Sequence, residues 1–211
     1  MGAGFSHRLE QRDAPHSGGW VALAYGGLGA LGATLAEASG QSPLTTTGWA
    51  AGLLGAGSFA AVVSFGLGSL VAFATIRMTR MLGRARWARA LHADLRPITH
   101  GLGDGPILVM ALASGVGEEL FFRGWLTTFA GVFLSSLAFG VLHQVRGRAR
   151  WAWALWATVM GVAFATVYEL TGSLVGPVLA HVAINFANLR YLRDHDPEAK
   201  PHPLGGLLSR S

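Results

Sequence analysis

The feature that most constrains this chain is a series of long apolar runs that hold no charged residue. Such runs extend from Trp20 to Ala36 and from Trp49 to Ile76. A helix needs about 20 mostly apolar residues to cross the hydrocarbon core of a bilayer. Only 13% of the 211 residues are charged, whereas soluble domains carry about a quarter. These runs therefore exclude a soluble globular fold and predict helices that span a membrane.

Four further segments are apolar enough to extend this pattern. They run from Pro106 to Phe129, from Val132 to His143, from Trp151 to Tyr168 and from Leu174 to Leu189. Gly131 and Gly172 lie between neighbouring segments, where helices are expected to stop. The predicted fold class is an all-α polytopic membrane bundle of about six transmembrane helices.

The basic residues indicate how this bundle is oriented. Segments 1–19, 77–97, 144–150 and the tail after residue 189 together hold 15 lysines and arginines. The alternate connections between the predicted helices, 37–48, 130–131 and 169–173, hold none. Basic residues are retained on the cytoplasmic side of a membrane. Both termini are therefore predicted to be cytoplasmic, and every basic residue except Arg123 lies on that side. The net charge of +5 is expected to meet anionic lipids rather than nucleic acid.

Three regions follow from this pattern. Residues 1–104 would form two N-terminal membrane helices and a basic cytoplasmic segment, residues 105–192 a helical core, and residues 193–211 a polar cytoplasmic tail. Within the basic segment, apolar residues from Met78 to Leu95 recur at helical spacing between arginines, which favours an amphipathic helix on an anionic leaflet. A solvated basic loop is the alternative. The first apolar run is also compatible with a cleaved signal peptide.

Glycine is frequent inside these predicted helices. The chain has 30 glycines, and small residues allow transmembrane helices to approach one another closely. The helix-packing interpretation applies to the following glycines: Gly26, Gly29, Gly32, Gly52, Gly55 and Gly66.

Three ionisable residues lie together in the third apolar segment. An ionisable side chain deep in a bilayer costs at least about 2.5 kcal/mol. Glu119 and Arg123 are four residues apart with the acid first, which is the favourable order for an ion pair on a helix. Glu118 is rotated by about 100° from Glu119 and has no local cation, which suits a general base. A polar clasp that merely holds helices together is the structural alternative.

Three more polar residues are expected at the same depth. A rise of about 1.5 Å per residue brings His143, His181 and Asn185 near the level of Glu118 in the bilayer. His181 and Asn185 are four residues apart and therefore share one face of a helix. The chain has no cysteine, so thiol nucleophiles and thiolate metal sites are excluded. These four residues from three helices are the candidate site.

The order of these residues resembles the CAAX protease and bacteriocin-processing family of glutamic intramembrane endopeptidases, which is related to the type II CAAX prenyl endopeptidase. The resemblance lies in three motifs: Glu118-Glu119-x-x-x-Arg123, Phe139-x-x-x-His143 and His181-x-x-x-Asn185. It implies that Glu118 and His143 activate a water molecule, and that His181 and Asn185 stabilise the oxyanion. Glu119 and Arg123 would order the site. Residues 105–192 would then be a four-helix catalytic core. The expected activity is hydrolysis of a peptide bond in a membrane-associated protein or peptide.

Several functional alternatives stay open at this point. No cofactor is expected, but two histidines and a carboxylate are also a known zinc ligand set, so a zinc-dependent membrane protease is the first rival. A non-enzymatic immunity or scaffold protein of the same fold is the second, and a proton-coupled transporter is the third. Fifteen arginines against one lysine suggest a bacterial inner-membrane protein. Its substrate would then be a bacteriocin-like peptide or a carboxyl-terminal sorting signal, as in myxosortases.

Overall fold

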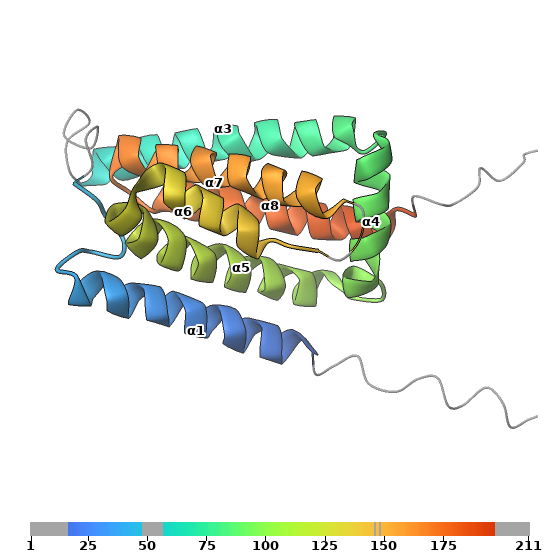
Figure 1. Ribbon diagram of the computed structural model, residues 1–211, viewed down its shortest axis with the longest axis horizontal. Coiled ribbons are helices and arrows are strands. Elements are labelled where there is room, and N and C mark those ends of the chain that lie inside the picture. The colour runs from blue at the N-terminus through green and yellow to red at the C-terminus, as the bar shows by residue number, and fades with distance from the viewer. Residues whose placement is uncertain (1–16, 48–56, 146, 148, 197–211) are drawn as a thin grey trace, which may run out of the picture.

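The computed structural model describes residues 17–47, 57–145, 147 and 149–196, and these residues form an all-helical bundle (Figure 1). The predicted fold class is therefore confirmed. Its elements are α1 (Ser17–Ala38), α3 (Ser58–Leu82), α4 (Arg86–Thr99), α5 (Asp104–Phe121), the π-helix η1 (Phe122–Thr127), α6 (Thr128–Leu142), α7 (Arg150–Thr171) and α8 (Val175–Asp194). The expected start of the second apolar helix at Trp49, and Gly52 and Gly55, lie outside the described residues.

Four stretches of the described chain are long and apolar enough to span a membrane. They are Gly19–Ala38, Ser58–Leu82, Asp104–Leu142 and Arg150–Thr171. The third has 39 residues, about twice the length that one crossing needs. Gly131 divides it, because its backbone has φ 82° and ψ 168°, and α6 then runs back along the bundle, packed against α7 (Figure 1).

The number of helices along the bundle axis agrees with the sequence prediction, but α8 is less apolar than expected. It carries His181, Asn185 and Asn188, and these polar residues lower its hydropathy below that of a typical membrane span. Figure 1 nevertheless shows α8 lying along the bundle between the other long helices. The polar residues of α8 are thus tolerated because neighbouring helices surround them.

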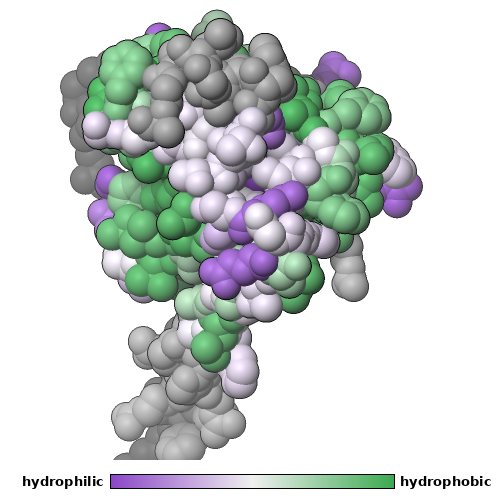
Figure 2. Space-filling view, turned by 90° about the vertical axis from the view of Figure 1, so that its left-hand side faces the viewer, coloured by the Kyte–Doolittle hydropathy of each residue, from purple (hydrophilic) through white to green (hydrophobic). Residues whose placement is uncertain are grey.

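The outer surface of the bundle is apolar. Large hydrophobic side chains point outward from every long helix, and Phe73, Phe133 and Leu155 each expose about two thirds or more of their surface. Figure 2 looks at one end of the bundle, where pale and purple side chains lie between flanks of apolar green ones. An apolar flank with a more polar end is what a bilayer-embedded bundle requires.

The arginine-rich helix ends gather at the other end of the bundle. There α3 and α8 end, α5 and α7 begin, and α4 lies across the long helices, whereas α6 points toward this end and stops short of it (Figure 1). The first residue of α1 lies at this end as well. Among the described residues, the arginines of segment 77–97 and Arg150, Arg190 and Arg193 therefore belong to helix ends or connections on one side. The cytoplasmic identity of that side stays a prediction.

The amphipathic helix is shorter than the sequence indicates. It begins at Arg86, because α3 continues through Leu82 and ends at Gly83. Met78 and Met81, which were assigned to the amphipathic helix, are exposed residues in the last turns of α3. Within α4, Leu91 is buried while Arg89 is exposed, so the amphipathic pattern itself is correct.

Glycines bring two pairs of helices into close contact. A Cβ atom at Gly32 of α1 would collide with the backbone of Phe121 in α5, and one at Gly68 of α3 would collide with Gly176 of α8. Gly29 of α1 also packs on α5, whereas added Cβ atoms at Gly26 and Gly66 meet nothing within 4 Å. The packing interpretation therefore holds for Gly29 and Gly32 only, since the other two face open space.

Candidate active site

The site begins with a buried ion pair at the end of α5. Nη1 of Arg123 lies 2.9 Å from Oε1 of Glu119, and both side chains are almost completely buried. Nη2 of Arg123 also donates a hydrogen bond to the carbonyl oxygen of Gly161 in α7, at 3.2 Å. The pair that the four-residue spacing indicates is thus present, and it ties α5 to α7.

The helix that carries this pair changes its winding between the two residues. The backbone N–H of Phe122 is shared between the carbonyl oxygens of Glu118 and Glu119, and residues 122–127 continue as a π-helix. Oγ1 of Thr127 donates to the carbonyl oxygen of Phe122, five residues back. Short π-helical turns are frequent at functional sites, and this one places Arg123 and Thr127 inside the bundle.

His181 of α8 lies on the other side of the same carboxylate. Its Nδ1 is 2.7 Å from Oε1 of Glu119. The imidazole ring stacks on Phe164, with ring centroids 5.2 Å apart, and Phe139 approaches it edge-on at 5.9 Å. Because phenyl rings hold the imidazole from two directions and Glu119 holds one nitrogen, the orientation of His181 is fixed.

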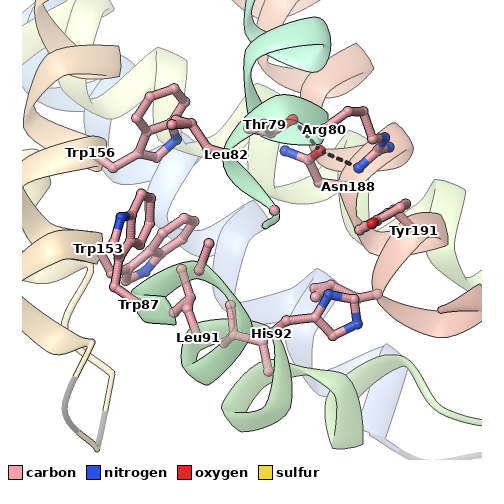
Figure 3. A pocket seen from close by; sticks show the side chains of 14 residues that line it. Thr79, Arg80, Leu82, Trp87, Leu91, His92, Trp153, Trp156, Asn188 and Tyr191 are labelled. Atoms are coloured by element: carbon pink, nitrogen blue, oxygen red, sulfur yellow. Dashed lines mark hydrogen bonds between the residues drawn. The ribbon is translucent and has the colours of Figure 1, made fainter. Parts of the chain in front are cut away.

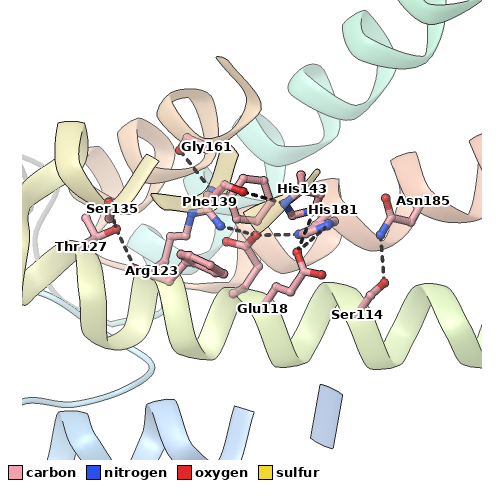
Figure 4. Close-up of polar contacts among 12 residues, drawn as sticks. Ser114, Glu118, Arg123, Thr127, Ser135, Phe139, His143, Gly161, His181 and Asn185 are labelled. Carbon is pink, nitrogen blue, oxygen red and sulfur yellow. Dashed lines mark hydrogen bonds and ion pairs between the residues drawn. The ribbon is translucent and has the colours of Figure 1, made fainter. Parts of the chain in front are cut away.

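Glu118 faces two histidines from two other helices (Figure 4). Its Oε2 atom lies 3.5 Å from Nε2 of His143 and 3.8 Å from Nε2 of His181. This oxygen is buried and has no hydrogen-bond partner among the described residues. The convergence of Glu118, His143 and His181 that their depth in the bilayer predicts is therefore present.

The contact that His143 makes with the backbone determines its tautomer. Nδ1 of His143 is 2.7 Å from the carbonyl oxygen of Phe139, and a carbonyl oxygen only accepts hydrogen bonds. Nδ1 must therefore carry the proton, which leaves Nε2 as an acceptor when the ring is neutral. His143 ends α6, and 22% of its side chain is exposed, so this histidine forms the open side of the site.

Asn185 lies next to these residues but makes a different contact. Its Nδ2 donates to Oγ of Ser114, at 2.9 Å, and Ser114 precedes Glu118 by one turn of α5. In Figure 4 the amide lies toward Ser114, away from the Glu118–His143 pair. One of the two amide hydrogens is thereby occupied, and the other remains for a further contact.

Two residues of the site were missed in the sequence. Ser114 is the partner of Asn185, and the Tyr25 hydroxyl of α1 interacts with the Glu118 carboxylate. Gly117 packs directly on the backbone of Tyr25, which brings α1 against the face of α5 that carries Glu118. The hydroxyl groups gave no signal, since a single tyrosine or serine in an apolar run is ordinary.

The histidine and carboxylate side chains of the site are also possible metal ligands. Within the described parts of the chain, no group of three or more histidine, aspartate or glutamate side chains is arranged to hold a metal ion. One nitrogen of each histidine is already occupied, by Phe139 and by Glu119.

Comparison with known families places this site in context. The family model named type II CAAX prenyl endopeptidase Rce1-like matches residues 105–187. This stretch, here called the Rce1-like domain, is similar to that family. It runs from α5 into α8 and contains Glu118, Glu119, Arg123, His143, His181 and Asn185, so the resemblance that the three motifs indicate is confirmed.

Part of this chain is also similar to the uncharacterized protein YpbD of Bacillus subtilis (strain 168). It is 34% identical over 79 residues, which cover 37% of this chain and 41% of the relative. The chain thus spans about two fifths of the length of that relative. No solved structure matches the chain. α1, α3 and α4 lie outside the Rce1-like domain, although Tyr25 of α1 reaches its site.

Proposed function

We propose that this chain is an intramembrane endopeptidase that cleaves a peptide bond with a water molecule activated by Glu118 and His143. Residues 105–192 would form its catalytic core. The observation that carries the proposal is Oε2 of Glu118, which is buried, has no donor among the described residues and faces Nε2 of His143 at 3.5 Å. The match of the Rce1-like family to residues 105–187 supports the same activity.

A water molecule would fit between Glu118 and His143, because the two atoms that face each other are both hydrogen-bond acceptors. Neutral His143 presents a lone pair at Nε2, and an ionised Glu118 presents another at Oε2. Two acceptors repel each other unless a proton or a donor lies between them. A water molecule supplies two donors and satisfies both atoms, and this contact polarises its oxygen for attack.

The reaction then balances as follows. Glu118 takes a proton from the water while the water oxygen bonds to the carbonyl carbon, and the carbonyl oxygen becomes negative. When the C–N bond breaks, Glu118 returns the proton to the leaving amine. His181 and Asn185 would stabilise the negative oxygen with N–H donors, and preorganised donors of this kind contribute most when water is excluded.

The alternatives fit the contacts less well. A polar clasp needs the Glu119–Arg123 pair, but it does not need Glu118, whose Oε2 bonds to nothing in the described structure. A non-enzymatic scaffold has no use for a carboxylate aimed at two histidines. We infer a mechanism without a cofactor, and the activity is expected to survive exhaustive chelation. Stoichiometric zinc in the purified protein, together with activity that zinc restores, would instead support the zinc-dependent protease.

The surroundings of the site suggest the class of substrate and its place in the cell. The site lies among apolar helices, so the substrate would be a membrane-anchored protein or peptide that reaches His143 from the side. The bundle would lie in a bacterial inner membrane, with both termini and α4 at the cytoplasmic face and anionic lipids around them. Maturation of a peptide, or removal of a carboxyl-terminal sorting signal, would fit this setting.

Comparative proteomics of a Glu118→Gln strain would test the proposal. Glutamine keeps the shape of the side chain but cannot take a proton from water. Membrane-anchored proteins that retain a terminal segment in the Glu118→Gln strain, and lose it in the parent strain, are the expected result. An unchanged set of protein termini would refute the endopeptidase function, provided that the Glu118→Gln variant and the wild-type protein are present in equal amounts in the membrane.

A further inference from the structure

A cavity of about 120 Å³ lies at the end of the bundle where α4 crosses the long helices. It lies between α3, α4, α7 and α8, and its wall has two different sides (Figure 3). One side is apolar and includes Trp87, Trp153 and Trp156. The other side is polar and includes Arg80, Asn188 and Tyr191. Such a division suits a ligand that is itself amphipathic.

Arg80 supplies the charge of the polar side. Its Nη2 donates to the carbonyl oxygen of Ala187 at 2.8 Å, and its Nη1 donates to Oδ1 of Asn188 at 3.3 Å. The guanidinium carbon lies 3.9 Å from the centre of the Tyr191 ring. All of these partners are neutral, and the ion pairs found among the described residues do not include Arg80.

A half-buried guanidinium with neutral partners favours an anion. Arg80 has five N–H donors, of which two are used by Asn188 and Ala187, so further donors remain for an oxyanion. Arginine binds phosphate oxygens through charge-assisted hydrogen bonds that are about twice as strong as neutral ones. The exposed arginines of α3 and α4 surround the same end of the bundle and add to the positive potential there.

We propose that this cavity binds an anionic phospholipid, with the phosphate on Arg80 and the first part of one acyl chain against the three tryptophans. The position agrees with this ligand, because α4 is an amphipathic helix at the basic end of an otherwise apolar bundle. A peptide would bring backbone N–H and C=O groups, which a wall of tryptophan and leucine leaves unpaired. An acyl chain has no such groups.

The site is distinct from the catalytic one, although the two are close. The rings of Trp153 and His143 are 6.2 Å apart, so a bound lipid would lie one side chain away from the histidine at the open side of the active site. The inference does not depend on proteolysis, because lipid binding can be measured on an inactive protein. A failed binding test would therefore leave the proposed endopeptidase function untouched.

The test is a titration of the purified full chain in detergent with dioleoylphosphatidylglycerol or dioleoylphosphatidylcholine, followed by native mass spectrometry. The wild type is expected to prefer the phosphatidylglycerol. Arg80→Gln should weaken binding of the phosphatidylglycerol by about tenfold, the loss of one charge-assisted contact, and remove the preference. Arg77→Gln is the matched control, since Arg77 is an exposed arginine one turn earlier on α3 and does not line the cavity. It should change binding by less than about twofold.

A second variant guards against a folding defect in Arg80→Gln. Ala88 lines the cavity, and Ala88→Phe fills it while leaving Arg80 and its contacts to α8 in place. This variant should also weaken phosphatidylglycerol binding, and inorganic phosphate alone should not compete at lipid concentrations. Equal affinity of the wild type for the two lipids would overturn the proposal. So would equal losses in Arg77→Gln and Arg80→Gln, or an unchanged affinity of Arg80→Gln for phosphatidylglycerol, which would leave the cavity to another ligand.

Discussion

Nδ1 of His181 and Oε1 of Glu119 lie 2.7 Å apart in the interior of the bundle, and this contact determines what His181 can do. The carboxylate oxygen also accepts a hydrogen bond from Arg123, so Nδ1 must be the donor. Nε2 can then donate to an oxyanion only if the ring carries both protons. With a charged His181, the two carboxylates of the site are matched by two cations, and burial of all four groups becomes tolerable.

Glu119→Gln is expected to destabilise the protein far more than Glu118→Gln. It removes the only carboxylate that pairs with Arg123 in the described structure, and a stranded buried charge costs about 3 to 5 kcal/mol. Glu118→Gln leaves that pair intact and should unfold at nearly the wild-type temperature. Thermal unfolding of both variants in the same detergent measures the difference. Equal losses of stability would favour the polar clasp over a catalytic Glu118.

Asn185→Ala is expected to lower the cleavage rate by about a hundred- to a thousandfold with little change in KM, which is the usual loss for one oxyanion donor. Kinetics on the substrate found by proteomics measure it. Ser114→Ala is the matched variant, because Ser114 only orients the amide, and it should cost about tenfold or less. A normal rate in Asn185→Ala with weakened substrate binding would move Asn185 from catalysis to recognition.

Tyr25→Phe is expected to lower kcat by about tenfold while KM stays unchanged, because it removes the hydroxyl that interacts with Glu118 and thus loosens the base. Tyr168→Phe provides the control. The Tyr168 hydroxyl is also buried but has no partner in the described residues, so its loss should leave both constants unchanged. The same kcat in Tyr25→Phe and the wild type would exclude a role for Tyr25 in positioning Glu118.

Reporter fusions at Ser42 and at the carboxyl terminus test the orientation. Ser42 lies in the connection after α1, at the end of the bundle remote from α4, and the arginine distribution predicts that it is external. The carboxyl-terminal reporter should be cytoplasmic. Reporter activities that place the carboxyl terminus outside would invert the topology.

The features of the site that depend on spacing along a single helix were predictable from the sequence. The four-residue spacing of Glu119 and Arg123 correctly indicates their ion pair, and Gly131 and Gly172 correctly mark turns, with φ of 82° and 65°. The depth of His143 and His181 was also predictable, since the rise per residue fixes it. Each of these inferences needs only local geometry.

Lateral neighbours were not predictable in the same way. Hydropathy indicates that α1 is long and apolar enough to cross a membrane. It does not indicate that Tyr25 meets Glu118, because that contact depends on which helices are adjacent. The pairing of Ser114 with Asn185 and the π-helical turn at residues 122–127 were missed for the same reason. They arise from packing between helices, which leaves no periodic signal in either sequence segment.

The close packing of α1 on α5 has a consequence for the design of chimeric proteins. The glycine contacts at Gly32 and Gly117 leave no space for bulkier side chains between the two helices. Tyr25 also brings a hydroxyl group to Glu118. A chimera that transplants only residues 105–187 into another protein with an Rce1-like domain would pack α5 against a foreign first helix. Unless that helix also offers small residues and a hydroxyl at the matching heights, the graft would be misfolded or inactive, so α1 and the matched stretch should be exchanged as one unit.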